Sequence, residues 1–289
     1  MKISAVIVSR NDNYGGHLNE RATYCFNSAI ETYDEVTYVD WNSPGHSLLY
    51  DIKDNIKFKG NFKHIVIPPM AAHNLTGGDP HAQKCCEVLA RNIGLRRSTG
   101  DWLLSTNIDI IHPKRKELED TLGSLDSNTF YTISRRATNW DTIKKFYNGK
   151  ILFNQWGPLR EYLTSTSEER VLGEKTGEAD DYSIINCCGD YQIASKKVWD
   201  SIRGFEEELI YPLYADTNVQ KKAVMHGFNL KAIFNPALFH IDHGKGGGGF
   251  LTGVNRKAND YNRAIPLQGK TENPDTWGFS DIDIEYEVF

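Results

Sequence analysis

The stretch from Ala90 to Pro113, ARNIGLRRSTGDWLLSTNIDIIHP, constrains the fold of this chain more than any other. Its arginine-rich first part predicts the end of a helix, and Gly100 and Asp101 predict a break. The apolar run 102–104 then predicts a short buried strand that leads into a polar turn with Asn107 and Asp109. In α/β proteins, ligands usually bind beyond the carboxyl ends of such strands. The stretch therefore predicts an α/β fold with a ligand site near Asp109.

Charged side chains in the same stretch indicate the nature of that ligand. Asp109 offers a carboxylate, which is a ligand for divalent cations. Arg91, Arg96 and Arg97 precede the strand, and we expect them to face an anionic ligand. The alternative interpretation is a surface helix, a buried strand and a solvated turn without a binding role.

The N-terminal third contains further units of the same kind. Strands and helices alternate, with Gly-containing or Pro-containing loops between them. The expected strands are 3–9, 35–41 and 63–67, and the expected helices are 19–32 and about 82–98. This alternation predicts a mainly parallel sheet that is flanked by helices.

Residues 90–113, which we call the organising stretch, resemble the donor-binding core of nucleotide-sugar glycosyltransferases with the GT-A fold, related to glycosyltransferase family 2. Members carry a run similar to ARNxGxxxATGDWLxFxDxDxxxxP, which ends in the DxD motif. Here Asn107 replaces the first acid of that motif, and Asp109 keeps the last. An amide can still bond a ribose hydroxyl, but it is a poorer cation ligand than a carboxylate.

A second block, residues 188–228, resembles another signature of this family, GxxQxxSRxxfexigGFdExfxxxxxEDxDlxxRlxxxGf. The acid that matches the catalytic base is Asp216, at the beginning of a predicted helix that ends near Gly227. Ala215 stands where many relatives have Glu. Asp is also a favoured helix N-cap, so a structural role is the alternative for Asp216.

The resemblance also implies contacts with the nucleotide sugar. Asp40, in the run VDWNS at the end of the second strand, matches the acid that bonds the nucleotide base, although an acid at a strand end is often only a turn or cap residue. The other implied donor contacts are Ser9, Arg10 and Asp12 in the loop after the first strand, and Arg91, Asn107 and Ile108 around the motif.

Two histidines lie in a predicted loop after a strand at 228–234. His240 and His243 form an H-x-x-H pair, which can offer two imidazoles to one metal ion. The resemblance implies that a late histidine completes the metal site with the acidic motif. The predicted ligands of Mn²⁺ or Mg²⁺ are therefore Asp109, His240 and His243. We do not expect a structural zinc site, because no cysteine lies nearby.

These features together predict a metal-dependent, inverting glycosyltransferase. It would transfer a sugar from a nucleotide-diphosphate sugar to a hydroxyl of a glycan or another acceptor, with Asp216 as general base. The alternative is a non-catalytic nucleotide-sugar or glycan-binding module, which the substitutions at Asn107 and Ala215 favour. A sugar-nucleotide pyrophosphorylase fits less well, because VSRNDNYGG is not a Gly-rich basic loop.

The expected organisation is one GT-A domain over residues 1–245 with a C-terminal extension at 246–289. Residues 1–112 form its nucleotide-binding half and residues 113–245 its acceptor-side half. Aromatic residues between 140 and 162 are expected to contact the acceptor or to pack in the core. The glycines at 246–249 begin the extension and predict a lid or linker.

Composition bounds the remaining possibilities. Apolar residues make up 39% and charged residues 25% of the 289 residues, as in ordinary globular proteins. The net charge of −5 argues against nucleic-acid binding through a basic surface. The apolar run at the N-terminus is too short for a signal peptide, and we find no transmembrane segment. The five cysteines do not indicate a disulfide framework, so we expect a soluble, cytoplasmic protein. The oligomeric state is unknown.

Overall fold

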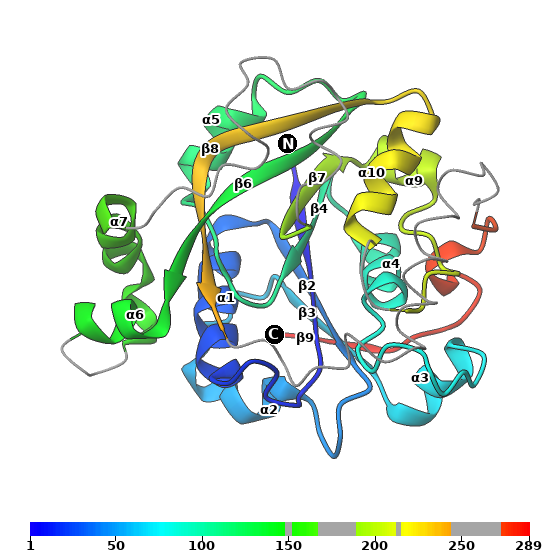
Figure 1. Ribbon diagram of the computed structural model, residues 1–289, viewed down its shortest axis with the longest axis horizontal. Helices are drawn as coiled ribbons and strands as arrows, with labels where there is room; N and C mark the ends of the chain where they lie inside the picture. Colours follow the sequence, from blue (N-terminus) through cyan, green and yellow to red (C-terminus); the bar gives the residue numbers. More distant parts are fainter. Residues whose placement is uncertain (148–151, 167–188, 212–214, 244–272) are drawn as a thin grey trace.

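The computed structural model describes residues 1–147, 152–166, 189–211, 215–243 and 273–289. A mixed sheet runs through the molecule, with helices on both of its faces (Figure 1). Within the described residues the sheet has nine strands. In spatial order they are β5 (Ile110–Ile111), β8 (Asn229–Asp242), β6 (Thr129–Asn139), β7 (Tyr191–Ser195), β4 (Trp102–Asn107), β1 (Ile3–Ser9), β2 (Glu35–Trp41), β3 (Phe62–Ile67) and β9 (Tyr286–Val288).

The helices connect these strands. The α-helices of the described residues are α1 (Leu18–Thr32), α2 (Leu48–Ile52), α3 (Pro69–Leu75), α4 (Glu87–Arg97), α5 (Arg115–Leu122), α6 (Trp140–Phe146), α7 (Trp156–Thr166), α9 (Lys196–Ile202) and α10 (Ala215–Met225). Three short 3₁₀ turns are η1 (Lys53–Asn55), η2 (Phe153–Gln155) and η4 (Trp277–Phe279). Among the described parts of the chain, no helix has the length and apolarity that crossing a bilayer requires.

Strand direction determines where side chains converge. β3, β2, β1 and β4 are parallel, and β6 and β8 run in the same direction as β4, because β7 is antiparallel to both β4 and β6. The carboxyl ends of these parallel strands and the beginning of β7 therefore meet at one edge. Every residue of β1 and β2 is buried, as expected for central strands of a sheet covered on both faces.

Each face of the sheet has its own hydrophobic core. On one face, side chains such as Ile7 and Leu104 pack against α1, α2 and α5. On the other face, side chains such as Val6 and Leu103 pack against α4, α9, α10 and η4. A third, smaller core joins α6 and α7 to the ends of β5 and β8. This alternation follows from the two-residue period of a strand.

Several residues of the organising stretch serve packing. A Cβ on Gly94 would lie 2.4 Å from Cγ1 of Val6, so glycine lets α4 approach β1. Asn92 donates from Nδ2 to the carbonyl of Phe205 (2.8 Å) and accepts from the amide of Phe205 (2.7 Å). Gly204, with φ of +66°, lies against the same asparagine. The two signature blocks therefore contact each other directly.

The structure corrects the expectation that Arg96 and Arg97 face an anionic ligand. The guanidinium of Arg97 donates to the carbonyls of Gly278 (2.6 Å), Phe279 (2.8 Å) and Ile282 (3.0 Å). Arg96 lies over the ring of the buried Trp277, 5.1 Å from its centroid. Both arginines therefore hold the C-terminal segment against α4.

The C-terminal segment completes the sheet. β9 pairs antiparallel with β3 at its edge, and Phe289 exchanges backbone hydrogen bonds with Phe62. Residues 273–289 thus belong to the same layered structure as the N-terminal half. The predicted glycine-rich lid at 246–249 and the domain boundary at 245 lie outside the described residues.

Two other expectations also need correction. The helix expected from residue 82 begins at Glu87. The expected loop that bears His240 is instead part of β8, which continues to Asp242 in parallel pairing with β6. Asn235 and Pro236 lie within β8. The pairing register between β8 and β6 shifts beside them, between Ile133 and Arg135 of β6, as at a β-bulge, so the strand continues.

We predict that Arg97→Ala lowers the free energy of unfolding by about 2 kcal/mol, because three carbonyls lose a charged donor. Affinity for the nucleotide that the resemblance leads us to expect as a ligand should not change. Denaturant unfolding and calorimetric titration measure the two quantities, and Lys116→Ala on the exposed face of α5 is the control. Weaker nucleotide binding at unchanged stability would contradict the structural assignment of Arg97.

Candidate active site

A cavity of about 540 Å³ opens at the edge where the parallel strands end. It lies between the loop after β1, the α4 side of the sheet, the turn after β4, and the beginnings of β7 and α10. The residues that line it are Val8, Ser9, Arg10, Asp12, Tyr14, Leu18, Gln83, Cys85, Glu87, Arg91, Asn107, Ile108, Asp109, Arg135, Gly189, Asp190, Gln192, Phe205, Ala215, Asp216, His240 and His243.

Nearly all the predicted site residues converge on this cavity. The strands that carry them are far apart in sequence but end side by side. The predicted residues in the lining are Ser9, Arg10, Asp12, Arg91, Asn107, Ile108, Asp109, Asp216, His240 and His243. Asp40 is the exception.

Asp40 does not line the cavity, although the resemblance assigned it to the nucleotide base. It is fully buried, and its Oδ2 accepts hydrogen bonds from Tyr38 Oη (2.8 Å), Ser47 Oγ (2.7 Å) and the amide of Leu48 (2.9 Å). The last two contacts lie at the N-terminus of α2. These contacts fit the alternative role of an acid at a strand end, which is to stabilise the following turn and helix.

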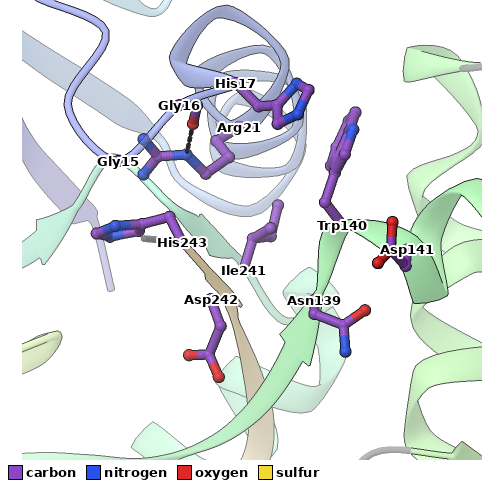
Figure 2. Close-up of a pocket in the computed structure, with 10 residues that line it drawn as sticks. All are labelled: Gly15, Gly16, His17, Arg21, Asn139, Trp140, Asp141, Ile241, Asp242 and His243. Atoms are coloured by element: carbon purple, nitrogen blue, oxygen red, sulfur yellow. Dashed lines mark hydrogen bonds between the residues drawn. The ribbon is translucent and has the colours of Figure 1, made fainter. Parts of the chain in front are cut away.

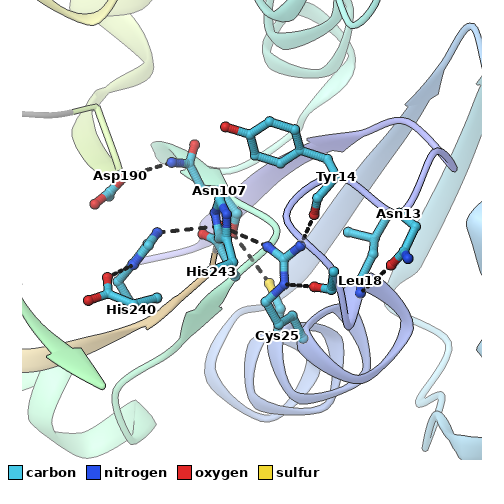
Figure 3. A network of polar contacts seen from close by, with 12 residues as sticks. Asn13, Tyr14, Leu18, Cys25, Asn107, Asp190, His240 and His243 are labelled. Carbon is cyan, nitrogen blue, oxygen red and sulfur yellow. Dashed lines mark hydrogen bonds and ion pairs between the residues drawn. The ribbon is translucent and has the colours of Figure 1, made fainter. Parts of the chain in front are cut away.

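Asp109 is the centre of a compact polar cluster. Figure 3 labels two of its neighbours in this cluster, His240 and His243. Its Oδ2 lies 2.9 Å from His243 Nε2 and 3.4 Å from His240 Nε2. Ligand atoms of these three residues all lie within 4.8 Å of one another. The structure thus brings together all three predicted metal ligands.

Backbone pairing explains this convergence. Ile110 of β5 pairs with His240 of β8, and the amide of Ile241 donates to the carbonyl of Asp109 (2.9 Å). Asp242 lies 2.9 Å from Nδ1 of His240. A carboxylate at Nδ1 orients the imidazole and leaves Nε2 directed at Asp109, as is common around metal-binding histidines.

Arg21 of α1 belongs to the same cluster, and the sequence did not indicate it. Its side chain is buried, its Nη1 lies 3.3 Å from Oδ2 of Asp109, and its Nε donates to the carbonyl of Gly16 (3.1 Å). Burial alone raises the pKa of Asp109, but His240, His243 and Arg21 outweigh it and hold this pKa well below its usual value. Asp109 is therefore a carboxylate.

The donor set of this cluster fits a divalent cation. One carboxylate and two imidazoles suit Mn²⁺ and similar first-row metals. Oδ1 of Asp109 is buried and has no hydrogen-bond partner within the described residues, so it remains available as a ligand atom. Asp109, His240 and His243 together could supply three ligands and leave other positions open.

Asp216 lies in the first turn of α10, on another wall of the cavity. Its Oδ2 accepts from the amide of Gly189 (2.8 Å) and its Oδ1 from the amide of Thr217 (2.9 Å). A Cβ on Gly189 would lie 2.5 Å from Cβ of Asp216, so glycine permits this close contact. The two amides hold the half-buried carboxylate in one orientation, and each oxygen has a further lone pair.

A row of alternating donors and acceptors crosses the cavity near Asn107. Arg91 Nη2 donates to Oδ1 of Asn107 (2.5 Å), and Nδ2 of Asn107 donates to Oδ1 of Asp190 (2.6 Å). The other oxygen of Asp190 pairs with Arg135. Asp190 and Arg135 were not predicted, because neither matches a position quoted for the resemblance.

A second, smaller cavity of about 300 Å³ lies beyond His243 (Figure 2). It is bounded by the N-terminus of α1 and by the ends of β6 and β8. His17 stacks on Trp140 there, with ring centroids 5.1 Å apart. His243 and Arg21 line this cavity as well, so the Asp109 cluster separates the two. Trp140 packs largely in the third core, as the packing alternative for these aromatic residues predicts.

We predict that Asp109→Asn lowers the free energy of unfolding of the metal-free protein by about 3 kcal/mol, because the buried Arg21 loses its charged partner. Adding Arg21→Met should recover part of this loss. Denaturant unfolding in a chelating buffer measures each variant. Strictly additive effects of the two substitutions would show that the residues do not interact.

Comparisons with known proteins were made by sequence and by structure. Models of protein families and curated protein sequences gave no match. Solved structures do match. S. aureus TarS 1-349 has a TM-score of 0.55 at 15% identity over 96% of this chain and 68% of that chain. GalNAc-T7 with UDP, GalNAc and Mn²⁺ has a TM-score of 0.59 at 14% identity over 91% of this chain and 48% of that chain.

A third similar structure is the mannosyltransferase PcManGT from Pyrobaculum calidifontis in complex with GDP-Man and Mn²⁺. Its TM-score is 0.52 at 11% identity, over 96% of this chain and 67% of that chain. The chain thus spans about half of GalNAc-T7 and about two thirds of the other two chains. Such identities establish the fold, whereas the activity has to be argued from the site. The expected α/β GT-A fold, with a mixed, mainly parallel sheet flanked by helices, is confirmed.

Proposed function

We propose that this protein is a metal-dependent, inverting glycosyltransferase that transfers a sugar from a nucleotide-diphosphate sugar to an acceptor hydroxyl. One observation carries the proposal: the Asp109, His240 and His243 cluster and the carboxylate of Asp216 line the same cavity at the carboxyl ends of the strands. Charge stabilisation for a leaving group and a base for a nucleophile are the two requirements of this transfer.

The donor occupies the part of the cavity between the loop after β1 and the Asp109 cluster. Ser9, Arg10 and Asp12 line this part, and Arg10 is fixed by Asp12 and by the carbonyl of Asn42 (2.8 Å). Similarity to GalNAc-T7 with UDP and to PcManGT in complex with GDP-Man supports a nucleotide-sugar donor.

The cation completes the donor site. Asp109, His240 and His243 would hold Mn²⁺ or Mg²⁺, and the ion would stabilise the negative charge of the leaving diphosphate. The carboxylate of Asp109 also balances Arg21, whose position is fixed by the carbonyls of Tyr14 and Gly16. Contacts within the protein therefore hold the side chains of this cluster in place.

Asp216 acts on the acceptor. A hydroxyl that approaches from the α10 side of the cavity donates its hydrogen bond to this carboxylate, which then takes the proton as the new glycosidic bond forms. Attack opposite to the leaving diphosphate inverts the anomeric carbon. Gly189 and Thr217 keep the carboxylate fixed during this step.

We predict that Mn²⁺ raises the thermal unfolding midpoint of the wild type in the presence of UDP or GDP, since binding to the folded state stabilises it. Asp109→Asn and His243→Gln should lose this increase, each measured against its own metal-free midpoint. His46→Gln, an exposed histidine outside the cavity, is the control. An equal manganese effect in all variants would remove this cluster from the metal site.

For Asp216→Asn we predict at least a hundredfold loss of transfer to an acceptor, while affinity for the nucleotide sugar stays within about twofold, because only the proton acceptor is removed. Transfer assays with donor and acceptor panels, together with calorimetric titration, measure both. Asp54→Asn on the surface is the matched control. A wild type that binds nucleotide sugars but neither transfers nor hydrolyses them would support a non-catalytic binding module instead.

A further inference from the structure

The contacts of Asn107 define its chemistry without ambiguity. Arginine can only donate hydrogen bonds and a carboxylate can only accept them, so Oδ1 of Asn107 must face Arg91 and Nδ2 must face Asp190. A side chain that accepts on one side and donates on the other is an amide. Asn107 therefore matches its two neighbours and is not merely a weakened acid.

An aspartate at position 107 would conflict with Asp190. Its second oxygen would lie where Nδ2 now lies, 2.6 Å from Oδ1 of Asp190. Two carboxylates so close disfavour ionisation of both. Arg91 could pair with the new acid, but its guanidinium already donates to Ser105 (2.5 Å) and to Glu87 (3.0 Å), so its charge is shared. The presence of Asp190 thus accounts for the amide at the first motif position.

Strand pairing fixes Asp190 in this place. β7 pairs antiparallel with β4, with Tyr191 opposite Thr106, so Asp190 comes next to Asn107. Its carbonyl accepts from Oγ1 of Thr106 (2.7 Å). Asp190 is buried at 4% exposure and lines the cavity, and Arg135 of β6 pairs with its carboxylate. A carboxylate held by Asn107 and Arg135 thus lies in the cavity together with both Asp109 and Asp216.

We propose that Asp190 is the carboxylate that binds hydroxyl groups of the transferred sugar, and that Asn107 is the residue that positions it. This inference rests on the proposed function. The carboxylate of Asp190 binds Asn107 and Arg135 and lines the cavity, where a carboxylate oxygen accepts a hydrogen bond from a ligand hydroxyl. A neutral sugar that offers hydroxyl donors matches this acceptor. The acid absent from position 107 is supplied by the neighbouring strand.

The first test measures the contact with the sugar. Calorimetric titration with Mn²⁺ compares free UDP and GDP with UDP-glucose, UDP-N-acetylglucosamine and GDP-mannose. Asp190→Asn should weaken binding of the preferred nucleotide sugar about tenfold or more, as loss of a charge-assisted hydrogen bond does, and leave binding of the free nucleotide within about twofold. Equal affinity of Asp190→Asn and wild type for the nucleotide sugar would overturn the proposal.

The second test exchanges acid and amide. Asn107→Asp alone should lower the thermal midpoint and weaken sugar-nucleotide binding, because it places a second carboxylate beside that of Asp190. The double variant Asn107→Asp with Asp190→Asn restores a donor and an acceptor across the pair. It should recover the thermal midpoint but not the affinity for the sugar. Recovery of both would assign Asp190 a structural role only, and an unchanged midpoint in Asn107→Asp would overturn the positioning by Asn107.

The two proposals fail in different ways. A wild type that binds none of the nucleotide sugars overturns the proposed function and this inference with it. A wild type that binds one of them, with a D190N variant that binds it equally well, overturns the role of Asp190 alone. Asp54→Asn, an acid-to-amide change outside the cavity, controls for the general effect of lost charge.

Discussion

The buried charge of Asp109 is the constraint on which the rest of the site depends. A buried carboxylate needs charged or hydrogen-bonding partners, and Arg21, His240 and His243 supply them from α1 and from the end of β8. These elements are remote in sequence, so their approach requires the whole sheet to form. Because removal of one partner would leave another charge buried, the polar cluster and the fold stabilise each other. The histidines that contact Asp109 also form, together with its carboxylate, a set of ligand atoms for a cation.

The organising stretch could be interpreted from sequence because much of it reflects packing. Asn92, Gly94 and Gly204 bring α4, β1 and the turn after α9 into contact, and only small or amide side chains fit there. Such requirements leave a regular spacing in the chain. The buried strands at 3–9 and 35–41 were predicted with their observed bounds for a related reason, since a strand covered on both faces is rich in apolar residues.

Other features left no such signal. Arg21 appears in the sequence as a polar residue on an amphipathic helix, and only the fold shows that it enters the interior. Arg97 has the charge expected of a ligand-binding residue, yet its guanidinium satisfies carbonyls of a segment about 180 residues away. The end of β8 contains no helix or turn signal of its own, and its pairing with β5 and β6 decides that His240 lies on a strand. Each of these outcomes depends on tertiary contacts that periodicity does not encode.

Asn107 shows how a substitution in a motif can be explained by its neighbours. Considered alone, the amide weakens the acidic motif and favours a binding module without activity. Considered with Arg91 and Asp190, it is the one group that satisfies a donor and an acceptor at once. The negative charge has not left the cavity, because Asp190 provides it at the start of β7, where Arg135 balances it. The number of carboxylates that line the cavity is therefore determined by the fold, and the motif alone gives too low a number.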